Sequence, residues 1–174
     1  TLRFIRFYNQ DIKKLDNQLF THVQPNIEQK EKWKLETRNI NLKKLTQLSL
    51  QIAPEFKDTN RIIIWPETSF EGSIPNESNL LSSISKEILT DPKTILVIGL
   101  LRTETKKLFN SLVFLNSNGN IIHQYDKIHL VPFGEYIPFR KNFSKIANFL
   151  STRDFSSGNI KSNVKLKGFG EILT

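Results

Sequence analysis

The sequence contains no cysteine and no methionine among its 174 residues, and it begins with Thr1. The lack of cysteine is compatible with oxidising and reducing surroundings alike, so it does not indicate a redox compartment. Because a primary translation product starts with methionine, we expect the sequence to be a fragment whose upstream part is missing.

Long apolar runs are absent as well. The longest run, Ile95–Leu101, is far shorter than the roughly 20 residues that a membrane-spanning helix needs, and the first residues do not resemble a secretion signal. The motifs GxSxG, GxxxxGK[ST] and GxGxxG do not occur, which removes support for serine-hydrolase and nucleotide-binding functions. His22, His123 and His129 lack the spacing of metal ligands, so we interpret them as structural or surface histidines.

The charge is basic, with 25 Lys and Arg against 17 Asp and Glu, a net +8. From residue 139 to the end, seven basic residues accompany Asp154 and Glu171, so this stretch contributes 7 − 2 = +5. Three interpretations remain open for this stretch: a solvated basic surface, contact with an anionic membrane surface, or contact with nucleic acid.

The hydrophobic pattern predicts a layered α/β or α+β domain. Apolar residues spaced by three, four and seven predict amphipathic helices over residues 35–53 and 80–88. Between residues 139 and 163 the periodicity weakens, which predicts a long loop serving as a lid or partner surface. Short apolar runs predict strands over residues 61–65, 95–101, 111–115, 121–125, 164–166 and 171–173.

Glu67 directly follows the predicted strand 61–65, after Trp65-Pro66. Active sites of α/β folds gather at strand ends, so we expect this carboxylate to be desolvated and able to exchange a proton near neutral pH. A surface glutamate after a strand would produce the same local pattern.

Lys127 follows the predicted strand 121–125, and the stretch 128–138 after it is too apolar and too rich in Pro and Gly for an ordinary surface loop. We expect this stretch to hold Glu135 close to Lys127. A fixed ammonium can stabilise the oxyanion that develops in acyl transfer, although a lone lysine after a strand is usually solvated. Glycoside hydrolysis by Glu67 and Glu135 would leave Lys127 unexplained.

Three stretches resemble the nitrilase, or carbon-nitrogen hydrolase, superfamily, and within it the apolipoprotein N-acyltransferase family. They are residues 23–27 (VQPNI) with Lys32-Trp33, residues 65–67 (WPE) and residues 125–138 (YDKIHLVPFGEYIP). The resemblance implies an α/β fold in which residues 23–174 form the N-terminal part of a nitrilase-like α-β-β-α sandwich. Residues 1–22 would then be a connector from a missing membrane portion.

The resemblance also implies roles for three residues. Glu67 would be the general base, Lys127 would stabilise the oxyanion, and Glu135 would be a second carboxylate that positions the lysine and the substrate. The nucleophilic cysteine of the family follows a strand that corresponds to residues 171–174, so we expect this chain to be an inactive fragment. No metal or cofactor is implied.

The complete enzyme would move an acyl chain from a phospholipid to the N-terminal amine of a lipidated lipoprotein cysteine, through an enzyme thioester. Its implied partners are the phospholipid donor, the apolipoprotein acceptor and a membrane surface, with no nucleic acid. Its implied place is the bacterial inner membrane, with the catalytic domain on the periplasmic side.

Two alternatives remain open: a fragment of a soluble nitrilase-type amidase, which shares the same catalytic residues, and a non-catalytic remnant of a split gene. Half of a sandwich would leave an apolar sheet face or edge uncovered. We therefore expect the isolated chain to be poorly soluble.

Overall fold

The computed structural model describes residues 17–28, 30–32, 34–51, 59–138, 154–159, 163–166 and 168–173. Its centre is a six-stranded sheet in the order β1-β2-β4-β5-β6, with β3 paired to β4. The strands are β1 (Gln18–His22), β2 (Asn60–Ile64), β3 (Phe70–Ile74), β4 (Thr94–Glu104), β5 (Lys107–Leu115) and β6 (Ile121–Asp126).

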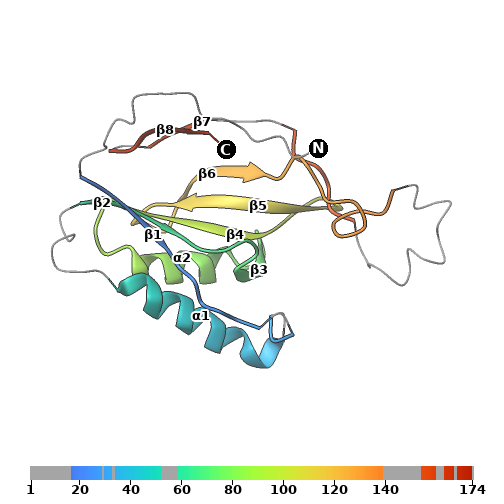
Figure 1. Ribbon diagram of the computed structural model, residues 1–174, viewed down its shortest axis with the longest axis horizontal. Helices are drawn as coiled ribbons and strands as arrows, with labels where there is room; N and C mark the ends of the chain where they lie inside the picture. Colours follow the sequence, from blue (N-terminus) through green and yellow to red (C-terminus); the bar gives the residue numbers. More distant parts are fainter. Residues whose placement is uncertain are drawn as a thin grey trace, which may run out of the picture.

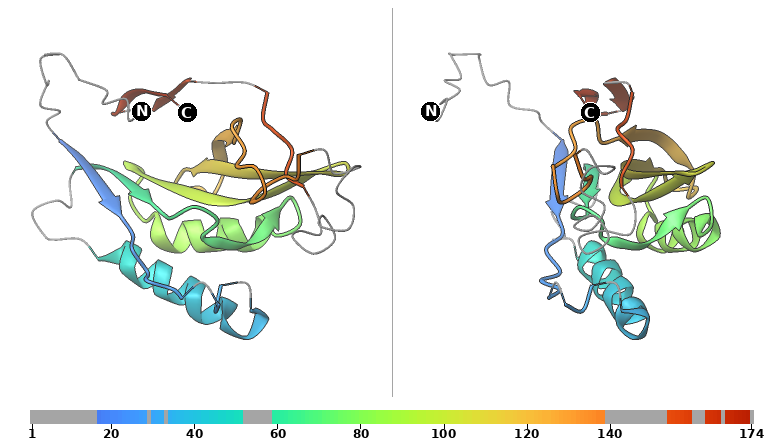
Figure 2. Two further views of the ribbon diagram at one scale, coloured as in Figure 1. Left: turned by 45° about the vertical axis from the view of Figure 1, so that its right-hand side comes forward. Right: turned by 90° about the vertical axis from the view of Figure 1, so that its right-hand side faces the viewer.

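Three layers make up the structure (Figure 1). Helices α1 (Leu35–Leu50) and α2 (Ser78–Ile88) cover one face of the sheet. A separate hairpin of β7 (Asn163–Leu166) and β8 (Gly170–Leu173) lies on the opposite face, as both views of Figure 2 show. The α/β class predicted from the sequence is therefore confirmed.

Successive side chains of the central strands point to opposite faces of the sheet, as the pleat of a strand requires. Ile63 and Ile98 belong to the core beneath the helices, together with Leu45 and Leu81. Their neighbours on the opposite face belong to a second core under the hairpin, formed by Ile62, Ile95, Val97, Phe114, Val164, Leu166 and Phe169. Coverage of both faces explains the uninterrupted apolar runs 62–64 in β2 and 95–101 in β4.

The strand directions bring several chain segments to one edge of the sheet. Strands β1, β2 and β4 are parallel, and β4, β5 and β6 are successively antiparallel, so β6 runs in the same direction as β4. The residues that follow β2 and β6 therefore emerge at the same edge, where the candidate site lies.

The helices differ from the prediction in detail. Helix α1 ends at Leu50, and residues 52 and 53 of the predicted helix lie outside the described residues. Leu35, which begins the apolar spacing of the predicted helix 35–53, is 81% exposed, because it is the first residue of α1 and that end of the helix lies away from the sheet (Figure 1). In the described part of the chain, no helix combines the length and apolar character of a bilayer span.

Two predicted segments remain largely outside the described residues. Most of the predicted loop 139–163 falls there, as do residues 1–16 of the predicted connector. The last part of that connector forms β1, which pairs with β2 in the sheet. The boundary at residue 22 and the connector role therefore stay predictions.

Candidate active site

Glu67, Lys127 and Glu135 lie together at the edge of the sheet where β2 and β6 end. Lys127 Nζ is 3.0 Å from Glu135 Oε1 and 3.5 Å from Glu67 Oε1, so one ammonium contacts both carboxylates. Residues that are 60 positions apart in the sequence are thus brought into one ion-pair network.

Asn110 completes the network from β5. Its Nδ2 donates hydrogen bonds to Glu67 Oε1 at 2.6 Å and to Glu135 Oε1 at 3.0 Å, and the residue is buried. An amide nitrogen has two N–H groups, so it can serve two carboxylates at once. Sequence reasoning missed Asn110, because an asparagine inside an apolar strand shows its function only when its neighbours are known.

The backbone places Glu67 in a tight turn after β2. Trp65 continues the strand pairing through its N–H to Val97 O at 2.9 Å, and the turn closes through the N–H of Ser69 to Pro66 O at 3.2 Å. The turn lies against Gly99 of β4, where a Cβ would stand 2.8 Å from Glu67 Cα. The lack of a side chain at Gly99 thus allows the turn to approach the sheet.

Glu135 is fixed by its own turn. The N–H of Val131 donates to Glu135 Oε2 at 2.8 Å, and the N–H of Glu135 donates to Val131 O at 2.9 Å. With Asn110 and Lys127, the carboxylate accepts three hydrogen bonds, and only 13% of its side chain is exposed. Glu135 is therefore a largely buried and well-satisfied carboxylate.

Residues 154–158, hereafter the strap, tie the site together from a later part of the chain. The N–H groups of Phe155 and Gly158 donate to Glu135 O at 2.8 Å and to Lys127 O at 2.9 Å. At the start of the strap, Asp154 Oδ1 accepts from the N–H of Ile137 at 3.2 Å. A Cβ on Gly158 would overlap the carbonyl oxygen of Asp126, so glycine allows this contact.

Both members of the Lys127–Glu135 pair are stabilised in their charged forms. The hydrogen bond to Glu135 raises the pKa of Lys127 above its usual value, against an opposing effect of burial. Burial alone would raise the pKa of Glu135, but the N–H of Val131, the amide of Asn110 and the ammonium of Lys127 together lower it. Lys127 is therefore an ammonium and Glu135 a carboxylate near neutral pH.

Glu67 differs from the sequence prediction. Its side chain is 65% exposed, so the expected desolvation is absent. The strand end does deliver the residue to the site, but the described structure does not cover the carboxylate. Glu67 is consequently the member of the network that is most open to solvent and to an incoming molecule.

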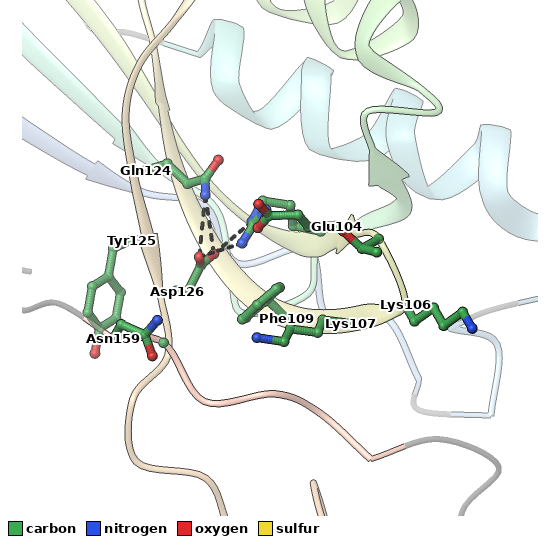
Figure 3. Close-up of a pocket in the computed structure, with 11 residues that line it drawn as sticks. Glu104, Lys106, Lys107, Phe109, Gln124, Tyr125, Asp126 and Asn159 are labelled. Carbon is green, nitrogen blue, oxygen red and sulfur yellow. Dashed lines mark hydrogen bonds and ion pairs between the residues drawn. The ribbon is translucent and has the colours of Figure 1, made fainter.

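A neighbouring network supports the end of β6 (Figure 3). Arg102 donates to Asp126 Oδ1 at 3.1 Å and to Asp126 Oδ2 at 2.8 Å, and this bonding raises the pKa of Arg102. Ser111 Oγ also lies 2.6 Å from Asp126 Oδ1. Arg102 and Asp126 line a pocket of about 660 Å³. Because Asp126 precedes Lys127, this pair fixes the strand end from which the lysine emerges.

Among the described residues, no group of three or more His, Cys, Asp or Glu side chains is arranged to hold a metal ion. The described members of the network are one cation, two carboxylates and one amide. Such a set can hold a negative oxygen against Lys127 and exchange a proton at Glu67.

Comparison with known proteins places this geometry in a family. The carbon-nitrogen hydrolase family matches residues 21–166. The chain is 28% identical over 159 residues to the apolipoprotein N-acyltransferase of Bradyrhizobium diazoefficiens, covering 84% of this chain and 29% of that protein. It is 36% identical over 126 residues to the apolipoprotein N-acyltransferase of Rhizobium rhizogenes, covering 67% of this chain and 23% of that protein.

A solved structure agrees at the level of the fold. Nit3 of Saccharomyces cerevisiae, a member of branch 10 of the nitrilase superfamily, is similar with a TM-score of 0.51 and 19% identity, over 77% of this chain and 48% of that chain. This likeness confirms the prediction of a partial nitrilase-like domain. The chain spans less than a third of the length of the two acyltransferases. It belongs to the carbon-nitrogen hydrolase family and is related to the acyltransferases and hydrolases within it.

Proposed function

We propose that this chain is the part of an apolipoprotein N-acyltransferase that carries the general base and the oxyanion-stabilising lysine. The single observation that carries the proposal is the contact of Lys127 Nζ with both Glu67 and Glu135. The similarity to acyltransferases of this name supports the choice of reaction.

The surroundings of the two glutamates distinguish their roles. Glu135 is largely buried and accepts three hydrogen bonds, so it holds Lys127 and keeps the lysine protonated. Glu67 is exposed and bonded by Asn110 and, at 3.5 Å, by Lys127, so its carboxylate can take up a proton. Glu67 is the general base of the proposal, and Lys127 faces the developing oxyanion.

The proposed reaction has two steps. A cysteine thiol loses its proton to Glu67 and attacks the ester carbonyl of a phospholipid, and the lysophospholipid leaves with the proton from Glu67. The N-terminal amine of a lipidated lipoprotein cysteine then attacks the thioester and gives up one proton to Glu67. The C–S bond breaks, and the leaving thiolate takes that proton back from Glu67. Lys127 stabilises the tetrahedral oxyanion in each step.

No cysteine is present among the 174 residues, so the proposal requires a thiol from outside them. We therefore expect the isolated chain to be inactive. The phospholipid donor, the apolipoprotein acceptor, the membrane surface and the periplasmic face of a bacterial inner membrane all belong to the proposal.

The test uses the protein expressed from the complete reading frame that contains this segment, assayed with phospholipid vesicles and a diacylglyceryl lipopeptide. Mass spectrometry is expected to find the N-acylated peptide and, without acceptor, an acyl thioester on the enzyme. Substitutions Glu67→Gln and Lys127→Met should each lower kcat by about 100-fold or more, because proton transfer and oxyanion stabilisation each supply such factors.

Matched controls come from exposed residues of the two helices. Glu87→Gln in α2 and Lys44→Met in α1 should leave transfer unchanged, since both side chains are exposed and neither belongs to the network. Ammonia release from small amides without lipopeptide acylation would instead assign an amidase. Transfer that survives Lys127→Met would contradict the oxyanion role.

A further inference from the structure

The side chain of Lys32 ends on the turn that carries Glu67. Lys32 Nζ donates to Glu67 O and to Thr68 Oγ1, both at 3.1 Å, across 35 and 36 positions of sequence. The Lys32-Trp33 pair belongs to the stretches that resemble the family, and the proposed mechanism gives Lys32 no role. Its contacts suggest what it does.

The turn requires external support. Thr68 has φ of 46°, in the left-handed region that favours glycine, and it carries a branched side chain. On its inner side the turn lies against Gly99, where a Cβ would stand 2.7 Å from Thr68 N. Lys32 Nζ contacts the carbonyl oxygen of Glu67 and the hydroxyl of Thr68. The turn is therefore held by β4 on one side and by the ammonium of Lys32.

The carboxylate of Glu67 depends on this backbone for its direction. Its side chain is 65% exposed, and among the described residues it contacts Asn110 and Lys127. A small cavity of about 160 Å³ lies beside the turn, lined by Lys32, Pro66 and Ser69 together with residues 24–27. Side-chain packing around the carboxylate is therefore sparse, and the position of the turn sets the position of the base.

An ammonium suits this task. It offers three N–H donors on a flexible stem, of which two are used by a carbonyl and a hydroxyl oxygen. Within the part of the chain that the structure describes, Lys32 forms no ion pair with a carboxylate. Its hydrogen-bonding capacity is thus directed to the turn.

We propose that Lys32 is a positioning residue that fixes the Glu67 turn in the conformation needed for proton transfer. The inference rests on the proposed function, since it assigns Lys32 to the general base of that reaction. It links residues 23–32 to the catalytic network without giving them contact with the substrate.

The first test is kinetic and uses the full-length protein with phospholipid vesicles and the diacylglyceryl lipopeptide. Lys32→Met keeps the stem and removes the donors, and it should lower kcat by about 100-fold, the cost of misplacing a catalytic group by about 1 Å. KM should stay within about twofold, because substrate contacts are unchanged. Lys32→Arg should recover most of kcat, whereas Lys30→Met, at an exposed lysine paired with Glu28, should match the parent.

The second test does not need activity. Hydrogen exchange of peptides covering residues 66–69 should accelerate in Lys32→Met, while peptides from β4 and β5 keep the exchange of the parent. Unchanged exchange at the turn, or acceleration throughout the sheet, would overturn the positioning role. So would a parental kcat in Lys32→Met, or a rise in KM at constant kcat.

The two tests separate the two proposals. If the parent protein transfers no acyl group, the proposed function fails, and hydrogen exchange at the turn then decides whether Lys32 holds it. If the parent is active and exchange at the turn does not respond to Lys32→Met, the proposed function stands and the role of Lys32 is rejected.

Discussion

At the scale of single residues, the surroundings of Glu67 and Glu135 distinguish two chemically identical groups. Glu135 is 13% exposed and accepts from three donors, whereas Glu67 is 65% exposed. Asn110 donates to both and so keeps two like charges beside one ammonium. Removing one shared donor should therefore disturb both glutamates together.

Asn110→Leu tests this arrangement. Leucine has a similar size but no N–H group, so Lys127 would be the remaining shared donor of the two carboxylates, and their mutual repulsion would increase. We expect kcat of the full-length protein to fall by about 100-fold. Asn118→Leu, in an exposed turn, is the control, and a kcat of Asn110→Leu within about threefold of the parent would contradict the role.

The pKa shifts of the Lys127–Glu135 pair predict how stability depends on pH. The pKa of Glu135 is lowered from 4.5, so its contribution is present above pH 4.5 and is lost as the pH falls through the depressed value. The pKa of Lys127 is raised from 10.5, so its contribution is present below pH 10.5 and is lost as the pH rises through the elevated value.

Thermal unfolding of the parent and of Glu135→Gln checks this prediction. The difference in Tm should be largest near neutral pH and should shrink at both the acidic and the alkaline end. For Glu87→Gln, at an exposed position of α2, the difference should be small at every pH. A Tm difference between the parent and Glu135→Gln that grows towards acidic pH would contradict the prediction.

At the scale of secondary-structure elements, β4 shapes the turn that carries Glu67. Gly99 lies opposite backbone atoms: a Cβ there would be 2.7 Å from Thr68 N and 3.0 Å from Pro66 O. Backbone atoms cannot rotate away as a flexible side chain can. The missing side chain at Gly99 is therefore part of the site.

Gly99→Ala should lower the free energy of unfolding by about 1–3 kcal/mol, the usual cost of overpacking. It should also lower kcat, because the turn must move. Urea unfolding and the transfer assay measure the two effects. Gly134→Ala is the matched control, since its Cβ would meet Val131 Cγ1 at an ordinary 3.6 Å.

The sequence predicted some of these elements and not others, for physical reasons. Strands β2 and β4 were predictable because both of their faces are covered, which produces continuous apolar runs. Strands β1 (QLFTH) and β3 (FEGSI) are short and mixed in character, and pairing with β2 and β4 defines them. The exposure of Glu67 was unpredictable, because it depends on what covers the strand end.

At the scale of the whole molecule, the two faces of the sheet are covered by layers of different kinds. Two helices cover one face, whereas the two-stranded hairpin β7–β8 covers the other. The ring of Phe169 packs in the second core and contacts the ring of Phe20 edge-on, with centroids 6.0 Å apart. Phe20 itself remains 48% exposed. The poor solubility predicted from the sequence remains to be measured.

Phe169→Ala tests the contribution of the hairpin. Loss of a buried phenylalanine typically costs about 3–5 kcal/mol, so the free energy of unfolding in urea should fall by that order. Uncovering the second core should also promote self-association in sedimentation velocity. Phe133→Ala, at a side chain that is 63% exposed, should change neither quantity appreciably, and equal behaviour of the two variants would contradict this view.

The strap has a consequence for how such chains vary in length. The hydrogen bond between Ile137 and Asp154, together with that between Phe155 and Glu135, brings the two ends of the intervening segment to one point. Once both ends of a segment are fixed, each doubling of its length costs about 0.6 kcal/mol of closure entropy. Insertions and deletions between residues 137 and 154 are therefore expected to be tolerated among related chains, while the carbonyl groups of Lys127 and Glu135 stay anchored.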